Sequence, residues 1–122
     1  MKRYDPYKHA HDLQIPIIHR RLLTANGMWL PRERVIVVQS GLRVVHERSA
    51  LAHEIAHALL GHVDDKPKSE VQADRLASEN MIDLDECREV MRWAPDFHLL
   101  ARELEVSPRL LRTFLNVHRL AG

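Results

Sequence analysis

The stretch 53–57, with the sequence His-Glu-Ile-Ala-His, has the spacing of a metal-binding helix. Residues four apart on an α-helix lie on one face, roughly 6 Å apart along the axis. Two imidazoles at this spacing can therefore bind one metal ion. Glu54 follows the first histidine and can reach a metal-bound water without binding the ion itself. This pattern is typical of zinc peptidases, with His53 and His57 as ligands and Glu54 as general base.

The neighbouring residues argue against a chance pair of histidines on an amphipathic helix. Small and apolar side chains surround the three ionisable groups, and such groups need partners, which a metal supplies. Apolar residues recur at helical spacing over 51–60, without proline. Gly61 is suited to end this helix in the left-handed conformation. Ser49 is a candidate for the cap at its start.

A catalytic zinc ion usually has three protein ligands and a water, so a third ligand is needed. Glu70 is our first choice, because it begins the next predicted helix after a loop that can reverse the chain. Asp74 follows one turn later on the same face, where it can accept the free ring N–H of a histidine ligand. Alternatively, both acids only stabilise the helix start. Weaker candidates for the ligand are Asp64, Asp65 and Glu79.

The sequence does not identify the group that stabilises the oxyanion of the transition state. The candidates for an oxyanion or substrate contact are Tyr4, Tyr7, His46, His62 and His98. His62 follows Gly61 and so lies beyond the expected helix end. The longer metzincin motif would need glycine and histidine where the chain has Leu60 and Val63. We therefore expect His62 to support the site from outside the metal's ligands or to lie on the surface.

Composition restricts the class of protein. A chain of 122 residues fits a single domain, 1–122, and its net charge of +1 argues against a strongly basic nucleic-acid surface. Cys87 is the only cysteine, so an internal disulfide is impossible. No signal peptide or membrane-spanning stretch is recognisable. We therefore expect a cytoplasmic protein.

Short apolar runs in the first third of the chain predict three strands. Their ranges are 15–18, 28–30 and 35–38. The third run is uninterrupted and β-branched, whereas Pro16 places the first at a sheet edge. The pair Asn26-Gly27 predicts a turn between the first two strands, so we expect mainly antiparallel pairing.

Capping signals after the metal-binding stretch predict a series of helices. Ser69 and Gln72 match a capping box, Asp83 and Asp96 are caps, and Ser107-Pro108 is a cap followed by proline. The predicted helices span 69–81, 83–93, 96–104 and 107–118. The fold class is therefore α+β: a small, three-stranded, mainly antiparallel sheet packed with the metal-binding helix and the C-terminal helices.

Together, the motifs His53-Glu-Ile-Ala-His57 and Glu70-Val-Gln-Ala-Asp74 resemble the ImmA/IrrE family of zinc metallopeptidases. The resemblance extends over about residues 13–118. It implies that His53, His57 and Glu70 bind zinc, that Glu54 is the catalytic acid/base, and that Asp74 supports a ligand. The family's usual Leu-Leu-Met-Pro is absent from 81–83, which affects only the following turn.

The resemblance also implies a function. The family cleaves helix-turn-helix transcriptional repressors of phages, mobile elements or stress regulons, so we expect one such partner protein. Two alternatives remain open. The segment 97–115 resembles a helix-turn-helix with Arg109 and Arg112 on its second helix, which suits DNA or protein binding. However, the leucines of that helix are needed to close the core, so DNA binding is disfavoured. The other alternative is an antirepressor that holds its partner without cleaving it.

Overall fold

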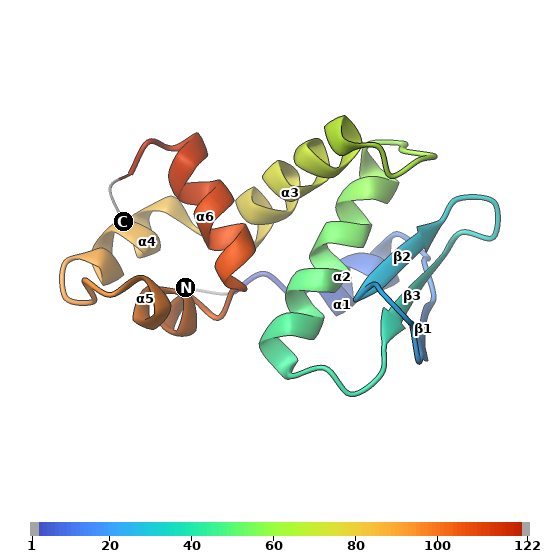
Figure 1. The fold of residues 1–122 in the computed structure, drawn as a ribbon, viewed down its shortest axis with the longest axis horizontal. Helices are drawn as coiled ribbons and strands as arrows, with labels where there is room; N and C mark the ends of the chain where they lie inside the picture. The colour runs from blue at the N-terminus through green and yellow to red at the C-terminus, as the bar shows by residue number, and fades with distance from the viewer. Residues whose placement is uncertain (1–2, 121–122) are drawn as a thin grey trace.

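The computed structural model describes residues 3–120, which form a helix, three strands and five further helices (Figure 1). The elements are α1 (Pro6–Asp12), β1 (Ile17–Arg20), β2 (Gly27–Leu30), β3 (Val35–Gln39), α2 (Val44–Leu59), α3 (Pro67–Met81), α4 (Leu84–Met91), α5 (Phe97–Leu104) and α6 (Pro108–Val117). This order confirms the predicted α+β class. No helix within residues 3–120 is long and apolar enough to cross a membrane.

The sheet is mixed, in the order β1-β3-β2, rather than mainly antiparallel. β1 pairs with β3 in parallel and β2 pairs with β3 in antiparallel orientation. The predicted turn at Asn26-Gly27 is therefore wrong, since β1 and β2 flank β3 and Gly27 is the first residue of β2. Two properties of β3 explain this order. Its centre is buried, which suits a middle strand, and the Gln39 amide satisfies the backbone of the β1–β2 connection at Leu22 and Ala25.

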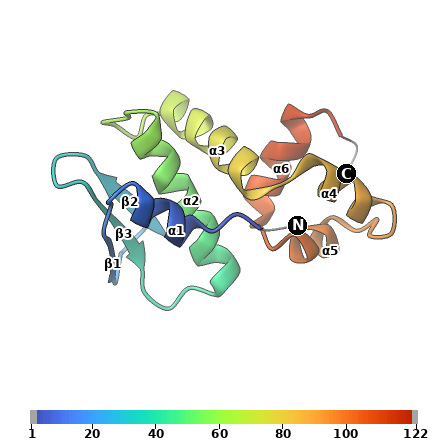
Figure 2. The ribbon, with the colours of Figure 1, turned by 180° about the vertical axis from the view of Figure 1, so that it is seen from behind.

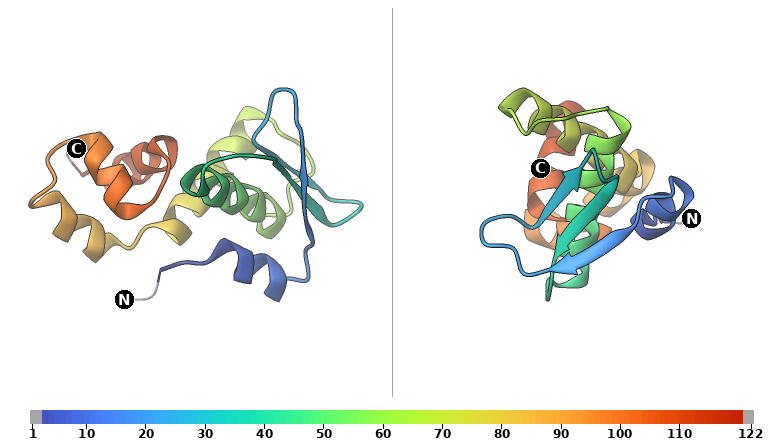
Figure 3. Two further views of the ribbon diagram at one scale, coloured as in Figure 1. Left: turned by 90° about the horizontal axis from the view of Figure 1, so that it is seen from below. Right: turned by 90° about the vertical axis from the view of Figure 1, so that its right-hand side faces the viewer.

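Helix α2 lies between two hydrophobic clusters and contributes a different face to each. Leu51 and Ile55 pack against Ile36 and Val38 of the sheet. The opposite cluster contains Ala52 and Ala56 of α2, Ala73 and Ala77 of α3, and apolar residues of α4, α5 and α6. The sheet accordingly lies at one end of the molecule and α4–α6 at the other, with α2 and α3 between them (Figure 3).

The start of the chain ties the two ends together. The polypeptide runs from beside α5 to α1, which lies against α2 (Figure 2). Arg3 donates a hydrogen bond to the carbonyl of Leu104, and Arg48 of α2 donates one to the carbonyl of Tyr4. These side chain–backbone contacts satisfy carbonyls near helix ends.

Several predicted helix ends are confirmed. Gly61 has φ of +69°, and the His62 N–H donates to the carbonyl of His57 at 3.0 Å, which closes the end of α2. Asp83, Asp96 and Ser107 each accept a hydrogen bond from a backbone N–H in the first turn of the helix that follows.

Two other helix starts were predicted wrongly. Helix α2 begins at Val44, so Ser49 is buried inside the helix, where its Oγ accepts a hydrogen bond from the Ser107 N–H at 3.0 Å. Helix α3 begins at Pro67, two residues before the predicted capping box. Ser69 instead donates to the carboxylate of Asp64. Both serine hydroxyls were predicted to cap a helix, but each one instead hydrogen bonds to a group outside that helix start.

Candidate metal centre

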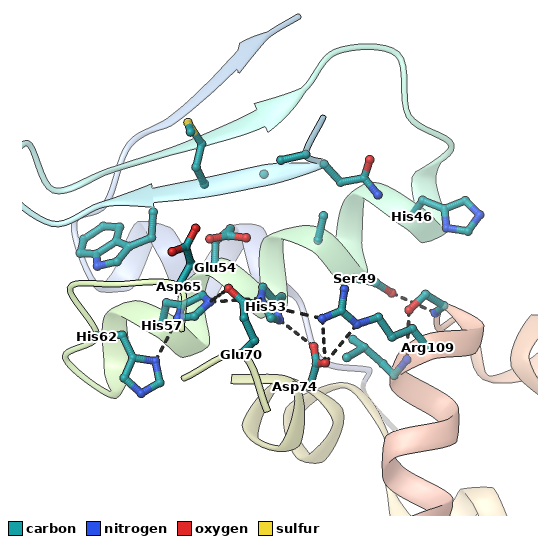
Figure 4. A pocket seen from close by; sticks show the side chains of 18 of the residues that line it. His46, Ser49, His53, Glu54, His57, His62, Asp65, Glu70, Asp74 and Arg109 are labelled. Carbon is teal, nitrogen blue, oxygen red and sulfur yellow. Dashed lines mark hydrogen bonds and ion pairs between the residues drawn. The ribbon is translucent and has the colours of Figure 1, made fainter. Parts of the chain in front are cut away.

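Two neighbouring helices place the predicted site residues on facing surfaces. His53 and His57 come from α2, one turn apart, while Glu70 and Asp74 come from the first half of α3. Fully buried alanines at the α2–α3 contact let the two backbones approach closely. As a result, the four side chains point toward one another between the helices (Figure 4).

The three residues predicted as ligands converge on one point. The Nε2 atom of His53 lies 2.7 Å from Oε2 of Glu70, and Nε2 of His57 lies 3.2 Å from Oε1 of Glu70. The two Nε2 atoms are 3.1 Å apart. Of the residues described, these are the ones whose donor atoms gather closely enough to hold a metal ion.

The donor set fits a metal ion. A tetrahedral ion with bonds of about 2.1 Å holds its ligand atoms roughly 3.4 Å apart. The distances of 2.7 to 3.2 Å observed here require only a small outward movement of the side chains. Two imidazoles and one carboxylate are a nitrogen–oxygen set that suits divalent transition metals. The three groups also line an open cleft, which leaves access for water.

The far side of the His53 ring meets a charged chain of residues. Its Nδ1 atom lies 2.8 Å from Oδ1 of Asp74, at ion-pair distance but without regular hydrogen-bond geometry. The other carboxylate oxygen of Asp74 accepts a hydrogen bond from Nε of Arg109 of α6 at 3.0 Å and lies 2.9 Å from Nη2 of the same guanidinium. Burial raises the pKa of Asp74, but His53 and Arg109 outweigh this effect and the pKa ends below its ordinary value.

The far side of the His57 ring faces His62, which in turn contacts Gln72. The Nδ1 atom of His57 lies 2.9 Å from Nδ1 of His62 (Figure 4). Nε2 of His62 lies 2.9 Å from Oε1 of Gln72. His62 thus contacts a candidate metal ligand, on the side of the ring that faces away from Glu70.

Glu54 is buried beside the edge of the sheet, with 7% of its surface exposed. Burial raises the pKa of its carboxyl to about 7, Glu70 adds to the rise, and His53 and the backbone of Trp29 oppose it. Glycine at position 27 gives this side chain room beside the strand. A Cβ atom at Gly27 would lie 3.1 Å from Cγ of Glu54 and 3.3 Å from the carbonyl oxygen of Val37.

An open cleft of about 890 Å³ runs over these residues. One wall is β2 with the residues before it, and the floor is the face of α2 that carries the histidines. The opposite wall combines the start of α3 with the start of α6, and the loop 62–65 closes one end. The candidate ligands and Glu54 therefore have access to a long, solvent-filled groove.

Comparison with known protein families gives one match. A family model described as IrrE N-terminal-like domain, Peptidase M78, matches residues 9–116. The chain belongs to the M78 peptidase family. Among curated proteins, no sequence matches it significantly. Membership confirms the predicted ImmA/IrrE family and supports a peptidase, and the histidine–glutamate cluster is compatible with the metal that such a metallopeptidase uses.

The structure does not bring every proposed contact residue of this M78 peptidase to the cleft. The Tyr7 hydroxyl donates to the carboxylate of Glu47, away from the cluster, and His98 is an exposed residue of α5. Tyr4 is hydrogen bonded to His9 at 2.6 Å. Neither Tyr7 nor His98 lines the cleft, and the identity of the oxyanion or substrate contact stays a prediction. His46 and His62 do line it.

The weaker rivals for the third ligand are placed elsewhere. Asp64 and Asp65 line one end of the cleft but lie outside the cluster of donor atoms. Glu79 forms an ion pair with His118. Their positions leave Glu70 as the carboxylate that faces both histidines.

Three residues of the M78 site escaped the sequence analysis in the role that the structure gives them. Arg109 pairs with Asp74, Gly27 gives space to Glu54, and Gln72 contacts His62. The first two contacts join residues far apart in sequence and have no local signal. The third contact had no clear signal either, because residues two apart on a helix, such as Glu70 and Gln72, do not share a face.

Proposed function

We propose that this protein is a zinc-dependent endopeptidase that cleaves a specific partner protein. The observation that carries the proposal is the convergence of His53, His57 and Glu70 within a few ångströms. Glu54, on the helix that carries the two histidines, lies beside them (Figure 4). Nitrogen and carboxylate donors in this number suit zinc, with one position left for water.

Each residue has a separate task in the proposed reaction. His53, His57 and Glu70 would hold a zinc ion, which would supply Lewis acidity and lower the pKa of a water molecule toward about 7. Glu54 accepts the proton of the attacking water and passes it to the leaving amine. The buried position of Glu54 limits the contact of its side chain with solvent, while the residue still lines the cleft beside the ligands.

The edge of β2 supports a mode of substrate binding. β2 pairs with β3 along one side only, and its residues line the cleft along the other. An extended peptide can add to such an edge by backbone hydrogen bonding, which places the peptide over Glu54 and the ligands. Gly27 keeps this part of the wall close to the floor.

The family resemblance supports the choice of partner. We propose a helix-turn-helix transcriptional repressor of a phage, a mobile element or a stress regulon as the substrate, met in the cytoplasm. Binding of DNA by α6 itself is disfavoured, because Leu110, Leu111 and Phe114 are buried in the core. Arg109 is paired with Asp74 rather than free for phosphates.

Glu54→Gln tests the proposed reaction. The variant should bind zinc as the unaltered protein does and should no longer cleave a helix-turn-helix repressor that the unaltered protein cleaves. Glu47→Gln is a matched control two turns earlier on α2, where Glu47 contacts Tyr7 and His19 and does not line the cleft, and it should retain cleavage. Cleavage by purified Glu54→Gln at the unaltered rate would refute the proposed role of Glu54. If instead the partner is inactivated equally well with a chelator present, the protein is an antirepressor that acts by binding.

A further inference from the structure

We propose that His62 and Gln72 are positioning residues that hold the His57 ring in its metal-binding tautomer. The proposal rests on the metal site described above and adds the chain that supports its second histidine. We call the hydrogen-bonded sequence Gln72, His62, His57 the neutral chain. It consists of two contacts, each of 2.9 Å.

The ring atoms that face one another fix where each hydrogen must be. His57 presents Nε2 to Glu70 and His53, so a metal there requires a lone pair on Nε2 and the hydrogen on Nδ1. That Nδ1–H needs an acceptor, and Nδ1 of His62 is the atom that faces it. His62 must then carry its own hydrogen on Nε2, which donates to Oε1 of Gln72. Each of the two ring N–H groups then meets an acceptor.

The reverse arrangement would block the metal. If the Gln72 amide presented its NH₂ group, Nε2 of His62 would be the acceptor and Nδ1 of His62 the donor. His57 would then carry its hydrogen on Nε2, the atom that must bind the ion. The carboxamide orientation observed, with Oε1 toward His62, is the one that leaves Nε2 of His57 free.

The end of α2 holds His62 in this place. Gly61 adopts a left-handed conformation, with φ of +69°, and the His62 N–H donates to the carbonyl of His57 at 3.0 Å. This turn folds the His62 ring back against the His57 ring, with centroids 5.1 Å apart and planes at 64°. The contact comes from the side of the His57 ring opposite to Glu70, so His62 supports the ligand and does not replace it.

Zinc affinity tests the neutral chain without relying on activity. His62→Leu removes the acceptor and should weaken zinc binding by about 10- to 100-fold, measured by competition with a chromophoric chelator. His62→Asn places an amide oxygen near the position of Nδ1 and should recover most of the affinity. A packing role alone would not distinguish Asn from Leu in this way. Cobalt spectra of the variants report the ligand field directly.

Gln72 provides a second, independent comparison. Glu at position 72 can only accept a hydrogen bond, so Gln72→Glu should retain or increase zinc affinity. Gln72→Leu should weaken binding severalfold, less than His62→Leu, because Gln72 is exposed and water can replace it. His46→Leu is the control, since His46 lines the same cleft from the start of α2. It should bind zinc normally.

The outcomes distinguish failure of the positioning role from failure of the metal site itself. If the unaltered protein binds zinc and His62→Leu binds it equally well, the positioning role is refuted and the metal site stands. Equal weakening by His62→Leu and His62→Asn, with both variants folded by circular dichroism, also refutes it. Failure of the unaltered protein to bind zinc would refute the metal site, and the neutral chain with it.

Discussion

The two histidines of the candidate metal centre have outer partners of opposite character. His53 meets a carboxylate, Asp74, which is itself held by the guanidinium of Arg109. His57 meets the uncharged chain of His62 and Gln72. Burial lowers the pKa of both rings, but Asp74, Glu54 and Glu70 reverse the effect at His53, whose pKa is raised. The pKa of His57 remains lowered.

The two chains also differ in how the fold builds them. The charged chain joins α2, α3 and α6, so it depends on tertiary packing of distant segments. The neutral chain depends mainly on the turn at the end of α2, with Gln72 at the start of α3. His53 is therefore supported by opposite charges that tertiary packing brings together, whereas His57 is supported mainly by the local backbone geometry at the end of α2.

Removing the Asp74 carboxylate should produce the largest change in zinc affinity, larger than any change on the His62 side of the site. Asp74→Leu leaves the His53 ring nitrogen and the Arg109 guanidinium without their partner, so we expect zinc affinity to fall by about 100-fold. Asp74→Asn makes the charged chain neutral and should cost less. Competition with a chelator measures both variants, and Asp65→Asn, in the cleft wall, is the control. A loss at Asp74→Leu smaller than at His62→Leu would reverse the ranking proposed here.

Glu54 belongs to neither chain, and its stability effect should be the next largest. Its folded pKa of about 7 lies above the ordinary value of 4.5, so the metal-free protein loses stability as pH rises from about 4.5 to 7, and the loss is complete above 7. Glu54→Gln should therefore stabilise the chelator-treated protein at pH 8 by up to about 3 kcal/mol. At pH 4 the gain should vanish. Urea unfolding at the two pH values measures it, and equal gains at both would contradict the burial argument.

The turn that forms the neutral chain should be sensitive to a single methyl group. Gly61→Ala places a side chain at φ of +69°, which costs about 1–2 kcal/mol. Space is not the reason, because a Cβ atom there meets nothing within 4 Å. Thermal unfolding should show this loss of stability. Zinc affinity should also fall if the strained turn displaces His62. Gly41→Ala, also at positive φ but far from the metal, controls for strain alone.

Arg109 should have the smallest effect of the four. Its side chain is 66% exposed, so the solvent screens its ion pair with Asp74. Arg109→Met should weaken zinc binding only severalfold, and Arg109→Lys should recover part of the loss. Arg112→Met, on the same helix but over the Phe97 ring, should leave affinity unchanged. A loss as large as that of Asp74→Leu would show that Asp74 works only when Arg109 holds it.

The parts of the structure that follow helical spacing were predictable from sequence. His53 and His57 lie one turn apart, as do Glu70 and Asp74, so each pair was placed on one face before the fold was known. The caps at Asp83, Asp96 and Ser107 were also predicted, since capping depends on residues within a single turn.

Features that depend on tertiary partners were not predictable. The strand order required knowing that β3 lies in the middle, which local turn signals at Asn26-Gly27 misrepresented. Gly27 is needed for its distance to Glu54, and Arg109 for its contact with Asp74, neither of which leaves a mark in the local sequence. Ser49 looked like a helix start because nothing in its neighbourhood indicated that Ser107 would use its hydroxyl.

The position of Arg109 on α6 links metal binding to the packing of the C-terminal helices. Its guanidinium reaches Asp74 only while α6 lies against α3, and Ser49 holds the residue before α6 through the Ser107 N–H. Thermodynamic coupling is reciprocal. If packing of α6 increases the affinity for the metal ion, then binding of the ion must stabilise the packing of α6 by the same free energy. Loading with metal should thus slow amide exchange in α6 as well as around the histidines.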